Sequence, residues 1–478
     1  MASTSSISGL VSGIDTASIV SKLMEIEARP QVLLKSQLAT AKTNARALRE
    51  VNTALATLSS AAEALTGATA FTGRTATSTG KDVTTAATIA AVPGSSVSFT
   101  VTGLASTQTS LSTATWSSRT GDVRTAAATN YTDPLPGWPL TVLSADGTKV
   151  VDTIDLPPGA SLDDAANAIN KKKSLGLTAT VVRLDADHYK LQVTSATTGT
   201  KNGFVLRGTG EAAGATTPSF GTLVAARDAE LKIGSETATS PTNTFADLLT
   251  GVTVTVSQVT TTPTTVTVSA DDASITGKVQ SLVNAAGAAL ATIAKYTDSS
   301  PGSTAPLKGN ATLTGLASRI LGQMSKAVGG TSPAVIGLQL NRDGTVKFDS
   351  AKLAALLKSD PSIAKKIVGG AVDLGADGVG GTADDAVQTD GLAARMYLLA
   401  KSASASATGM ITTLADGQDA RVKRIQTDVD TWDMRLQQRQ QLLTSKFQAM
   451  ESALGKLNSQ SSWLSSQINS LYNPNAKK

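Results

Sequence analysis

Residues 422–471 read VKRIQTDVDTWDMRLQQRQQLLTSKFQAMESALGKLNSQSSWLSSQINSL, and every seventh residue from the first is a bulky apolar side chain. The series consists of Val422, Val429, Leu436, Leu443, Met450, Leu457, Leu464 and Leu471. In a chain that is 41% hydrophobic, eight such residues in one frame occur by chance at roughly 0.001, so the period is a real signal. A seven-residue apolar period is typical of helices that pack lengthwise on other helices. The stretch predicts a long α-helix with an apolar seam, and the alternative is an amphipathic helix packed on its own domain.

A second apolar stripe accompanies this seam. It lies three residues after the seam at Ile425 and Trp432, and four residues after it at Phe447, Leu454 and Ile468. The pattern therefore drifts from coiled-coil spacing toward a broader helical face. At about 1.5 Å per residue, the stretch makes a rod of roughly 75 Å, which is too long for one compact domain to cover. Other helices must cover the rest of its apolar side.

The N-terminal region supplies a partner with the same period. After Pro30, a seam runs through Leu34, Ala41, Leu48, Leu55 and Ala62, and it is flanked by Leu38, Ala45, Val51, Leu58 and Leu65. Small residues allow a neighbouring helix to approach closely, while the leucines fill the space between two helices. Because the two seams lie at opposite ends of the sequence, their pairing would make a discontinuous domain with an insertion.

The insertion changes period from helical to strand-like. Between Val97 and Thr102 apolar and polar residues alternate, as in a half-buried strand. Asp146-Gly147 is a hairpin turn signal, and Ser161 is a helix cap before an apolar-periodic segment that ends at Gly176. Further strands are expected at Leu140–Leu143, Lys149–Ile154, Thr178–Leu184, Lys190–Thr194, Leu231–Ile233, Val252–Val256 and Thr265–Val268. Helical patterns return at Ser274 and continue at Leu313–Val328, Ser350–Leu357, Pro361–Val368 and Leu392–Leu414.

These patterns predict a multidomain α+β fold, with a discontinuous α-helical coiled-coil or bundle leg built from both termini and two inserted β-rich domains. We expect a terminal helical coiled-coil region, partly disordered in the free subunit, in residues 1–40 and 415–478. A helical leg domain is expected in residues 41–74 and 271–414. A β-rich head domain would occupy residues 75–136 and 223–270, and a small α+β head domain residues 137–222.

Composition argues against several function classes. The chain has no cysteine, which removes disulfides, thiolate nucleophiles and zinc–cysteine sites. It contains no run of 18 apolar residues, so we expect no membrane span. The net charge of +5 resides in residues 421–478, which hold nine Lys or Arg and four Asp or Glu. Because these cations alternate with acids and lack stacking aromatic residues on the same face, we expect a solvated helix face and no nucleic-acid partner.

Motifs for catalysis or cofactor binding are missing from the sequence. It contains no Walker loop, dinucleotide fingerprint, HExxH or GxSxG. Its single histidine, His188, lies in a segment that reads as a hairpin turn. We therefore expect no enzyme activity, no cofactor and no dedicated metal site. The weak candidates for a cation site are Asp373, Asp377, Asp384 and Asp385 in a Gly-rich loop, whose spacing does not fit an EF-hand.

Short strings at both ends of the chain carry a family resemblance. The opening SISGLVSGID at residues 6–15 and the closing LNSQSSWL at residues 457–464 are similar to bacterial flagellar filament cap proteins, the hook-associated protein 2 family. Further strings in the family's order are AELKIG at 229–234, NTFADLLTGVT at 243–253, PLKGN at 306–310 and NRDGTVKFD at 341–349. Residues 103–135 and the loop around Asp377 match no family string.

The resemblance implies a structural assembly protein that forms a homo-oligomeric ring at the distal tip of the bacterial flagellum. It implies a secreted, extracellular protein that promotes insertion and folding of exported flagellin. The implied partners are other copies of the chain, flagellin, an export chaperone, the flagellar type III export apparatus and the hook–filament junction proteins. Alternatives are a distal-tip adhesin for host glycan or mucin, with Trp116, Trp138 and Tyr131 as candidate contacts, and a filament or junction subunit.

The residues that we expect to form the coiled-coil and partner interface are the apolar members of the two seams. They are Leu34, Leu48, Val51, Leu55, Leu58, Val422, Ile425, Val429, Trp432, Leu436, Leu443, Phe447, Met450, Leu454, Leu457, Leu464, Ile468 and Leu471.

Overall fold

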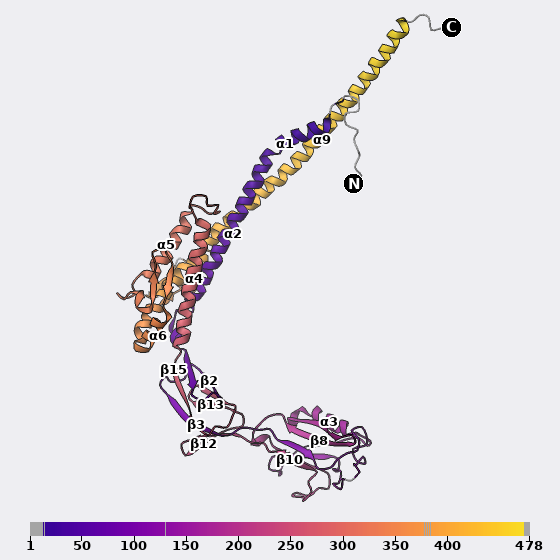
Figure 1. The fold of residues 1–478 in the computed structure, drawn as a ribbon, viewed down its shortest axis with the longest axis vertical. Coiled ribbons are helices and arrows are strands. Elements are labelled where there is room, and N and C mark those ends of the chain that lie inside the picture. The colour runs from indigo at the N-terminus through magenta and orange to yellow at the C-terminus, as the bar shows by residue number, and fades with distance from the viewer. Residues whose placement is uncertain are drawn as a thin grey trace, which may run out of the picture. The chain divides into compact units, whose positions relative to one another are not determined.

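The computed structural model describes residues 13, 15–129, 131–376, 378, 380, 382 and 384–472. The chain divides into two compact units. One unit combines the chain up to Phe71 with the chain from Asp272 onward, and the other comprises Thr72–Asp271. Figure 1 shows the first as mainly helical and the second as mainly β. The fold class is therefore the predicted multidomain α+β arrangement, with helices from both termini in one unit.

Helices and short ribbons make up the first unit. Its N-terminal part holds α1 (Thr16–Glu27), α2 (Arg29–Glu63) and the 3-10 turn η1 (Ala68–Phe71). Its C-terminal part holds α4 (Asp272–Thr297), α5 (Ala311–Ser325), η4 (Pro333–Ile336), β16 (Leu338–Leu340), β17 (Val346–Phe348), α6 (Ser350–Ser359), α7 (Pro361–Val368), β18 (Ala371–Asp373), β19 (Ala386–Thr389), α8 (Leu392–Ser404) and α9 (Met410–Tyr472). Strands β16 and β17 form one antiparallel ribbon, and β18 and β19 form another.

Local sequence signals explain where the terminal helices begin and end. The carboxylate of Asp15 accepts a hydrogen bond from the Ser18 amide at 3.0 Å and caps α1. Helix α2 starts at Arg29 with Pro30 in its first turn, where a missing amide hydrogen costs nothing. The segment Leu392–Leu414, predicted as one helix, belongs to two helices, because the helical conformation is interrupted between Ser404 and Met410. Gly409 lies in that break against the backbone of Ala405, where a side chain would collide.

The core of the first unit lies between α2, α4 and α8. Leu55, Leu58 and Val51 of α2 are completely buried there, together with Leu282 of α4 and Met396 of α8. Fully burying such side chains stabilises the fold by about 1.5–3 kcal/mol each relative to exposure. The apolar period of α2 thus places its C-terminal half inside a helical domain.

The second unit contains two hydrophobic cores. The first lies among β1 (Arg74–Ser78), β2 (Val83–Ala87), β3 (Ser96–Gly103), β11 (Ala229–Ile233), β12 (Glu236–Ser240), β13 (Thr244–Leu249), β14 (Val252–Val256) and β15 (Thr264–Ala270). These strands form two antiparallel sheets, in the orders β1-β15-β3-β11-β12 and β13-β14-β2. In β14, valines are buried and threonines half-buried in strict alternation, which is the period of a strand with one face on a core.

The second core lies among two further antiparallel sheets and a helix. The strands are β4 (Thr109–Ser112), β5 (Leu140–Ser144), β6 (Val150–Ile154), β7 (Leu177–Asp185), β8 (His188–Ser195), β9 (Phe204–Arg207) and β10 (Phe220–Val224), in the sheet orders β10-β4-β8-β7 and β6-β5-β9. The helix is α3 (Leu162–Lys171), and two short turns, η2 (Lys173–Leu175) and η3 (Thr200–Asn202), accompany it. Pairing of Leu140 with Ile154 confirms the hairpin predicted around Asp146-Gly147.

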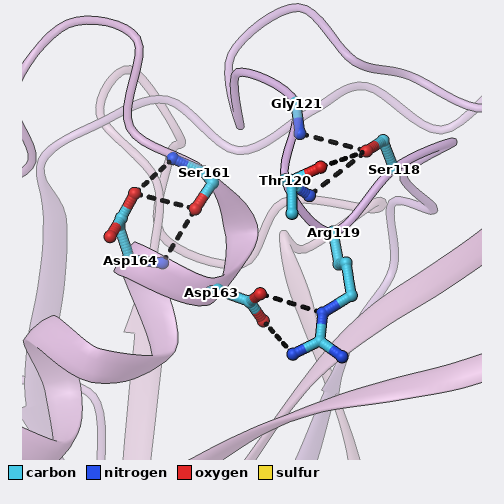
Figure 2. Close-up of polar contacts among 7 residues, drawn as sticks. All are labelled: Ser118, Arg119, Thr120, Gly121, Ser161, Asp163 and Asp164. Carbon is cyan, nitrogen blue, oxygen red and sulfur yellow. Dashed lines mark hydrogen bonds and ion pairs between the residues drawn. The ribbon is translucent and has the colours of Figure 1, made fainter.

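The start of α3 is fixed by polar contacts that Figure 2 shows. The Ser161 hydroxyl accepts from the Asp164 amide at 3.1 Å, and the Asp164 carboxylate accepts from the Ser161 amide at 3.0 Å, a reciprocal capping box. Beside it, the Arg119 guanidinium donates to both carboxylate oxygens of Asp163 at 2.8 and 3.0 Å. The loop around Arg119 is thereby held on the first turn of α3.

This arrangement differs from the expected boundary between the two head domains. The sequence predicts that residues 75–136 belong to the β-rich head, but β4 pairs with β8 of the α+β part. Trp116 is completely buried in the core of that part, and its indole nitrogen donates to the Val123 carbonyl at 2.8 Å. The chain from about Thr109 to Pro136 therefore lies with the α+β part. No local signal marks this change, because the strands before and after it have similar Thr-rich composition.

Candidate assembly surface on the terminal helices

Helices α1 and α2 lie antiparallel to α9. Along α2, Arg49 forms an ion pair with Asp419, and Lys35 lies 4.0 Å from the carboxylate of Asp433. On α1, the carboxylate of Glu27 accepts from Arg439 of α9 at 2.9 Å. Residue numbers thus fall along one helix as they rise along the other. Figure 1 shows the indigo and yellow helices side by side.

A small apolar cluster joins α2 to α9. Its buried members are Leu38, Ala41, Ile425 and Val429, and Leu34 and Val422 pack partly buried against it. Ala41 is only 1% exposed, as expected where a small residue lets two helices approach closely. The two predicted seams therefore meet in this segment.

Farther along α2, the N-terminal seam has additional partners. Leu48, Val51, Leu55 and Leu58 are buried in the core with α4 and α8. These residues therefore pack on several helices and not on α9 alone. The reason is that this half of α2 is enclosed by helices from the central part of the chain, whose positions the heptad pattern does not encode.

Along α9 the apolar seam becomes progressively more exposed. Ile425 and Val429 are buried, and the six apolar residues that follow in the seam and its companion stripe are half-buried: Trp432, Leu436, Leu443, Phe447, Met450 and Leu454. Further on, Leu457, Leu464 and Ile468 are 60%, 54% and 54% exposed. Leu471 belongs to the helix, but its side chain lies outside the described residues.

The partly covered section of α9 borders a groove against α1. The groove has a volume of about 570 Å³ and is lined by Thr16, Val20 and Met24 of α1 and by Thr444 and Phe447 of α9, among others. Val20, on the side of α1 that lines the groove, is buried. After the groove ends near Glu451, no described side chain of α9 is buried. We call Leu457, Leu464 and Ile468 the distal seam.

Charge is scarce on this end of the helix. From Leu454 to Ser470 the only ionisable side chain is Lys456, and the other polar residues are neutral. Earlier in α9 charged groups are engaged locally, as where the Arg435 guanidinium lies 5.7 Å from the centre of the Trp432 ring. A contiguous apolar stripe with few neighbouring charges is typical of a surface that another protein covers.

A second exposed apolar stripe, which we did not predict, runs along α1 and into the first turns of α2. It consists of Ile19, Leu23, Ile26 and Leu33, all of them exposed. Their spacing could have revealed it, since they follow one another at intervals of four, three and seven residues. The stripe was hidden in the sequence because Val20 and Met24, which interleave with it, also look like core residues.

The weak cation candidates do not form a metal centre in the described part of the chain. Asp373 accepts from the Gly375 amide at 3.1 Å, and Asp384 accepts from the Thr382 hydroxyl at 2.8 Å, so both carboxylates hold turns of their own loop. Asp385 accepts from the Thr382 amide at 3.1 Å, and Asp377 lies outside the described residues. Among the residues described, no group of three or more acidic or histidine side chains is placed to hold a metal ion.

The aromatic residues considered for an adhesin do not form a shared groove. Trp116 is completely buried and Trp138 is half-buried against the same core. Tyr131 is exposed, and its ring lies 5.0 Å from that of His188. His188 hydrogen-bonds through Nδ1 to Asp185 across the β7–β8 turn. A ligand could not stack on Trp116 without unfolding this core.

Fold and surface together define a class of protein: a multidomain assembly protein whose helical leg carries an uncovered apolar seam at its far end. None of the helices in the described ranges is long and apolar enough to cross a membrane.

Comparisons with known proteins identify the family. Models of the flagellar hook-associated protein 2 N-terminus and C-terminus match residues 12–108 and 226–459, and a flagellin hook IN motif model matches residues 141–197. Flagellar hook-associated protein 2 of Escherichia coli strain K12 is 28% identical, with 100% of both chains covered. A-type flagellar hook-associated protein 2 of Pseudomonas aeruginosa is 26% identical, with 98% of each chain covered.

A solved structure shares the fold. The crystal structure of the D1-D2-D3 domains of the flagellar cap protein FliD from Escherichia coli has a TM-score of 0.55 at 24% identity, and the match covers 78% of this chain and 99% of that chain. The chain belongs to the flagellar hook-associated protein 2 family and is a structural protein of the flagellar filament cap. The comparisons give no support to the adhesin alternative.

Proposed function

We propose that this chain assembles as a homo-oligomeric ring at the distal tip of the flagellum, where its distal seam receives helices of newly exported flagellin. The observation that carries the proposal is the loss of burial along α9, from Val429 at 3% exposed to Leu457 at 60%. An apolar helix face gains free energy only when another surface covers it. A flagellin subunit that offers an amphipathic helix would provide that surface.

The antiparallel pairing of α2 with α9 fixes the part of α9 that precedes the distal seam. The buried cluster around Leu38 and Ile425 and the pair between Arg49 and Asp419 hold the two helices in one register. The C-terminal end of α9, which carries the distal seam, extends beyond this paired part.

Within the ring, we propose that the helical leg of each subunit, formed by the terminal helices, adapts to a position on the filament that differs from subunit to subunit. A ring whose subunit number differs from the helical repeat of the filament cannot make the same contacts everywhere. Legs that contact flagellin through an apolar seam tolerate this mismatch, because apolar contacts are not directional. One leg position stays open, exported flagellin folds there, and its insertion advances the cap.

We further propose the partners and location that family membership suggests for a cap subunit. The chain would reach the tip through the flagellar type III export apparatus, with an export chaperone before transit, and would meet the hook–filament junction proteins when the first cap forms. In this proposal it is secreted and extracellular. The partly disordered state of residues 1–40 and 415–478 in the free subunit stays a prediction, although residues 16–27, 29–63 and 410–472 are helical here.

Deletion of residues 457–478 tests the proposal. Because no described side chain in this segment is buried, we expect the truncated chain to keep both compact units and remain soluble. Cells that carry it should release flagellin into the medium and build no filaments. Filaments of normal length from this variant would refute the proposed role of the distal seam.

A further inference from the structure

A polar cavity lies within the helical unit, between α5, α8 and β19. It has a volume of about 620 Å³, which is in the range of cavities that hold small ligands or short peptides. Its lining includes Arg319 and Gln323 of α5, Gln388 of β19, and Leu398 and Ser402 of α8. No seam residue of α2 or α9 lines it, so the cavity is separate from the assembly surface described above.

The α5 side of the cavity presents a row of polar residues. Arg319, Gln323 and Lys326 follow one another at intervals of four and three residues, which places them along one face of the helix and its end. The apolar residues Ile320 and Met324 of the same helix are buried in the core. At about 1.5 Å per residue, the row extends for roughly 10 Å.

A buried ion pair fixes the wall opposite this row. Arg395 of α8 is only 7% exposed, and its guanidinium forms an ion pair with Asp390. It also donates to the backbone carbonyls of Lys326 and Ala327, at 3.0 Å each. The charges of Arg395 and Asp390 therefore compensate each other, and the end of α5 is held against α8.

The remaining charges of the lining favour an anion. Arg319 and Lys326 are exposed, and neither forms an ion pair with another residue in the described ranges. The one further carboxylate of the lining, that of Asp385, accepts from the Thr382 amide at 3.1 Å. Two cations thus stand against one carboxylate, and the cavity carries a net positive charge.

The amide between the two cations adds a second requirement. The side-chain carbonyl oxygen of Gln323 is buried and accepts no hydrogen bond from the described part of the chain. A buried acceptor without a donor is destabilising, so a ligand that brings an N–H group together with its acid groups gains more than a simple anion does. Acidic peptides carry both, and three extended residues at about 3.3 Å each span the row.

We propose that this cavity binds an acidic peptide segment of a protein partner. Two of its carboxylates, three residues apart, pair with Arg319 and Lys326, and a backbone amide between them donates to Gln323. This contact goes beyond the proposed function, because the distal seam takes no part in it.

Fluorescence anisotropy of a labelled peptide, Gly-Glu-Ala-Ala-Glu-Gly, with the full-length chain tests the proposal. The peptide with Gln at both Glu positions is the ligand control. Arg319→Ala with Lys326→Ala removes the two cations of the cavity. Arg342→Ala with Lys347→Ala is the matched protein control, because it removes two exposed cations of the same unit that do not line the cavity.

We expect the cavity variant to weaken binding of the acidic peptide about tenfold or more, and the control variant to leave it unchanged. Gln323→Leu keeps the charge and should weaken binding about threefold or more. Equal binding by the cavity variant and the control variant would overturn the proposal, as would equal binding of the two peptides or no binding of either.

Two further arms identify what occupies the cavity. If inorganic phosphate displaces the peptide at the peptide's own concentration, the cavity is a small-anion site and the proposal is wrong. Asp377 belongs to the loop between β18 and β19 and lies outside the described residues. Binding that appears only after Asp377→Asn would show that this loop supplies the carboxylate, which also overturns the proposal. Neither result affects the distal seam.

Discussion

The double substitution Leu457→Ala and Leu464→Ala separates the stability of this subunit from its assembly. Both side chains lie on the solvent side of α9 at 60% and 54% exposure. Because they contribute little packing in the subunit, and alanine is a strong helix former, we expect the free energy of unfolding to change by less than about 0.5 kcal/mol. Assembly should respond much more strongly.

The expected size of the assembly defect follows from the area that remains to be buried. A leucine gains about 1.5–3 kcal/mol on full burial, and slightly more than half of each side chain is still open here. The double substitution therefore removes about 2–3 kcal/mol of binding free energy. At 1.4 kcal/mol per tenfold, binding weakens about 30- to 150-fold. We expect short or missing filaments and flagellin in the medium.

Two assays and a control decide this prediction. Guanidinium unfolding of the purified chain measures stability, and filament length with secreted flagellin measures assembly. The control is Ser459→Ala with Ser466→Ala, which changes two exposed residues of the same helix on a face away from the seam. Wild-type filaments from the seam variant, or a large loss of stability without an assembly defect, would refute the reasoning.

Three further predictions concern stability. Leu55→Ala removes a completely buried side chain from the core of the helical unit. The free energy of unfolding, measured with guanidinium, should therefore fall by about 2–5 kcal/mol. A loss below about 1 kcal/mol would contradict the burial of Leu55 in that core. Gln108→Leu removes a side-chain amide that donates to the Phe204 carbonyl at 2.5 Å and accepts from the Phe204 amide at 3.1 Å. Each buried group left unpaired costs about 1–3 kcal/mol, so calorimetry should show a lower Tm for the β unit. An unchanged Tm would contradict this. Hydrogen bonds from the Ser144 hydroxyl and from the amide and hydroxyl of Thr148 lower the pKa of Asp146 to about 2. Because this pKa lies below that of the unfolded chain, the carboxylate stabilises the fold above about pH 4 and loses that effect as pH falls through about 2. The Tm advantage over Asp146→Asn should therefore shrink on acidification, and an advantage that grows at low pH would contradict the assignment.

The helical ends could be predicted from the sequence because their signals are local and repeated. Asp15, Pro30 and the seven-residue series of α9 each act within one or two helical turns, and the structure places helices at all of them. The cluster of Leu38, Ile425 and Val429 also follows from the two seams. Strongly amphipathic strands such as β14 were predictable for the same reason.

Other features depend on contacts between distant residues and could not be predicted. Strands β1 and β12 read RTATS and ETATS, without a bulky apolar residue, so they form strands only because β15 and β11 offer them a paired edge. The complete burial of Leu55 depends on α4 and α8, which share a core with it. The placement of Trp116 in the α+β core depends on β4 crossing from one head part to the other.

The candidate surface was predicted in part. Heptad spacing marks Leu457 and Leu464 as seam residues but does not show whether a helix of the same chain covers them. It also does not show that α1 begins at Thr16 and that its groove with α9 reaches only to about Glu451. The stripe of Ile19, Leu23, Ile26 and Leu33 was overlooked because a helix with apolar residues on two sides reads as a buried one.

The most direct test of the account is the alkylation rate of Leu464→Cys in the full-length chain, compared between the free subunit and caps on growing filaments. Ser462→Cys on another face of the same helix provides the reference. The account predicts fast alkylation of both thiols in the free subunit and strong protection of position 464 alone on filaments. Equal alkylation of position 464 in both states would contradict the claim that the distal seam is the surface on which flagellin assembles.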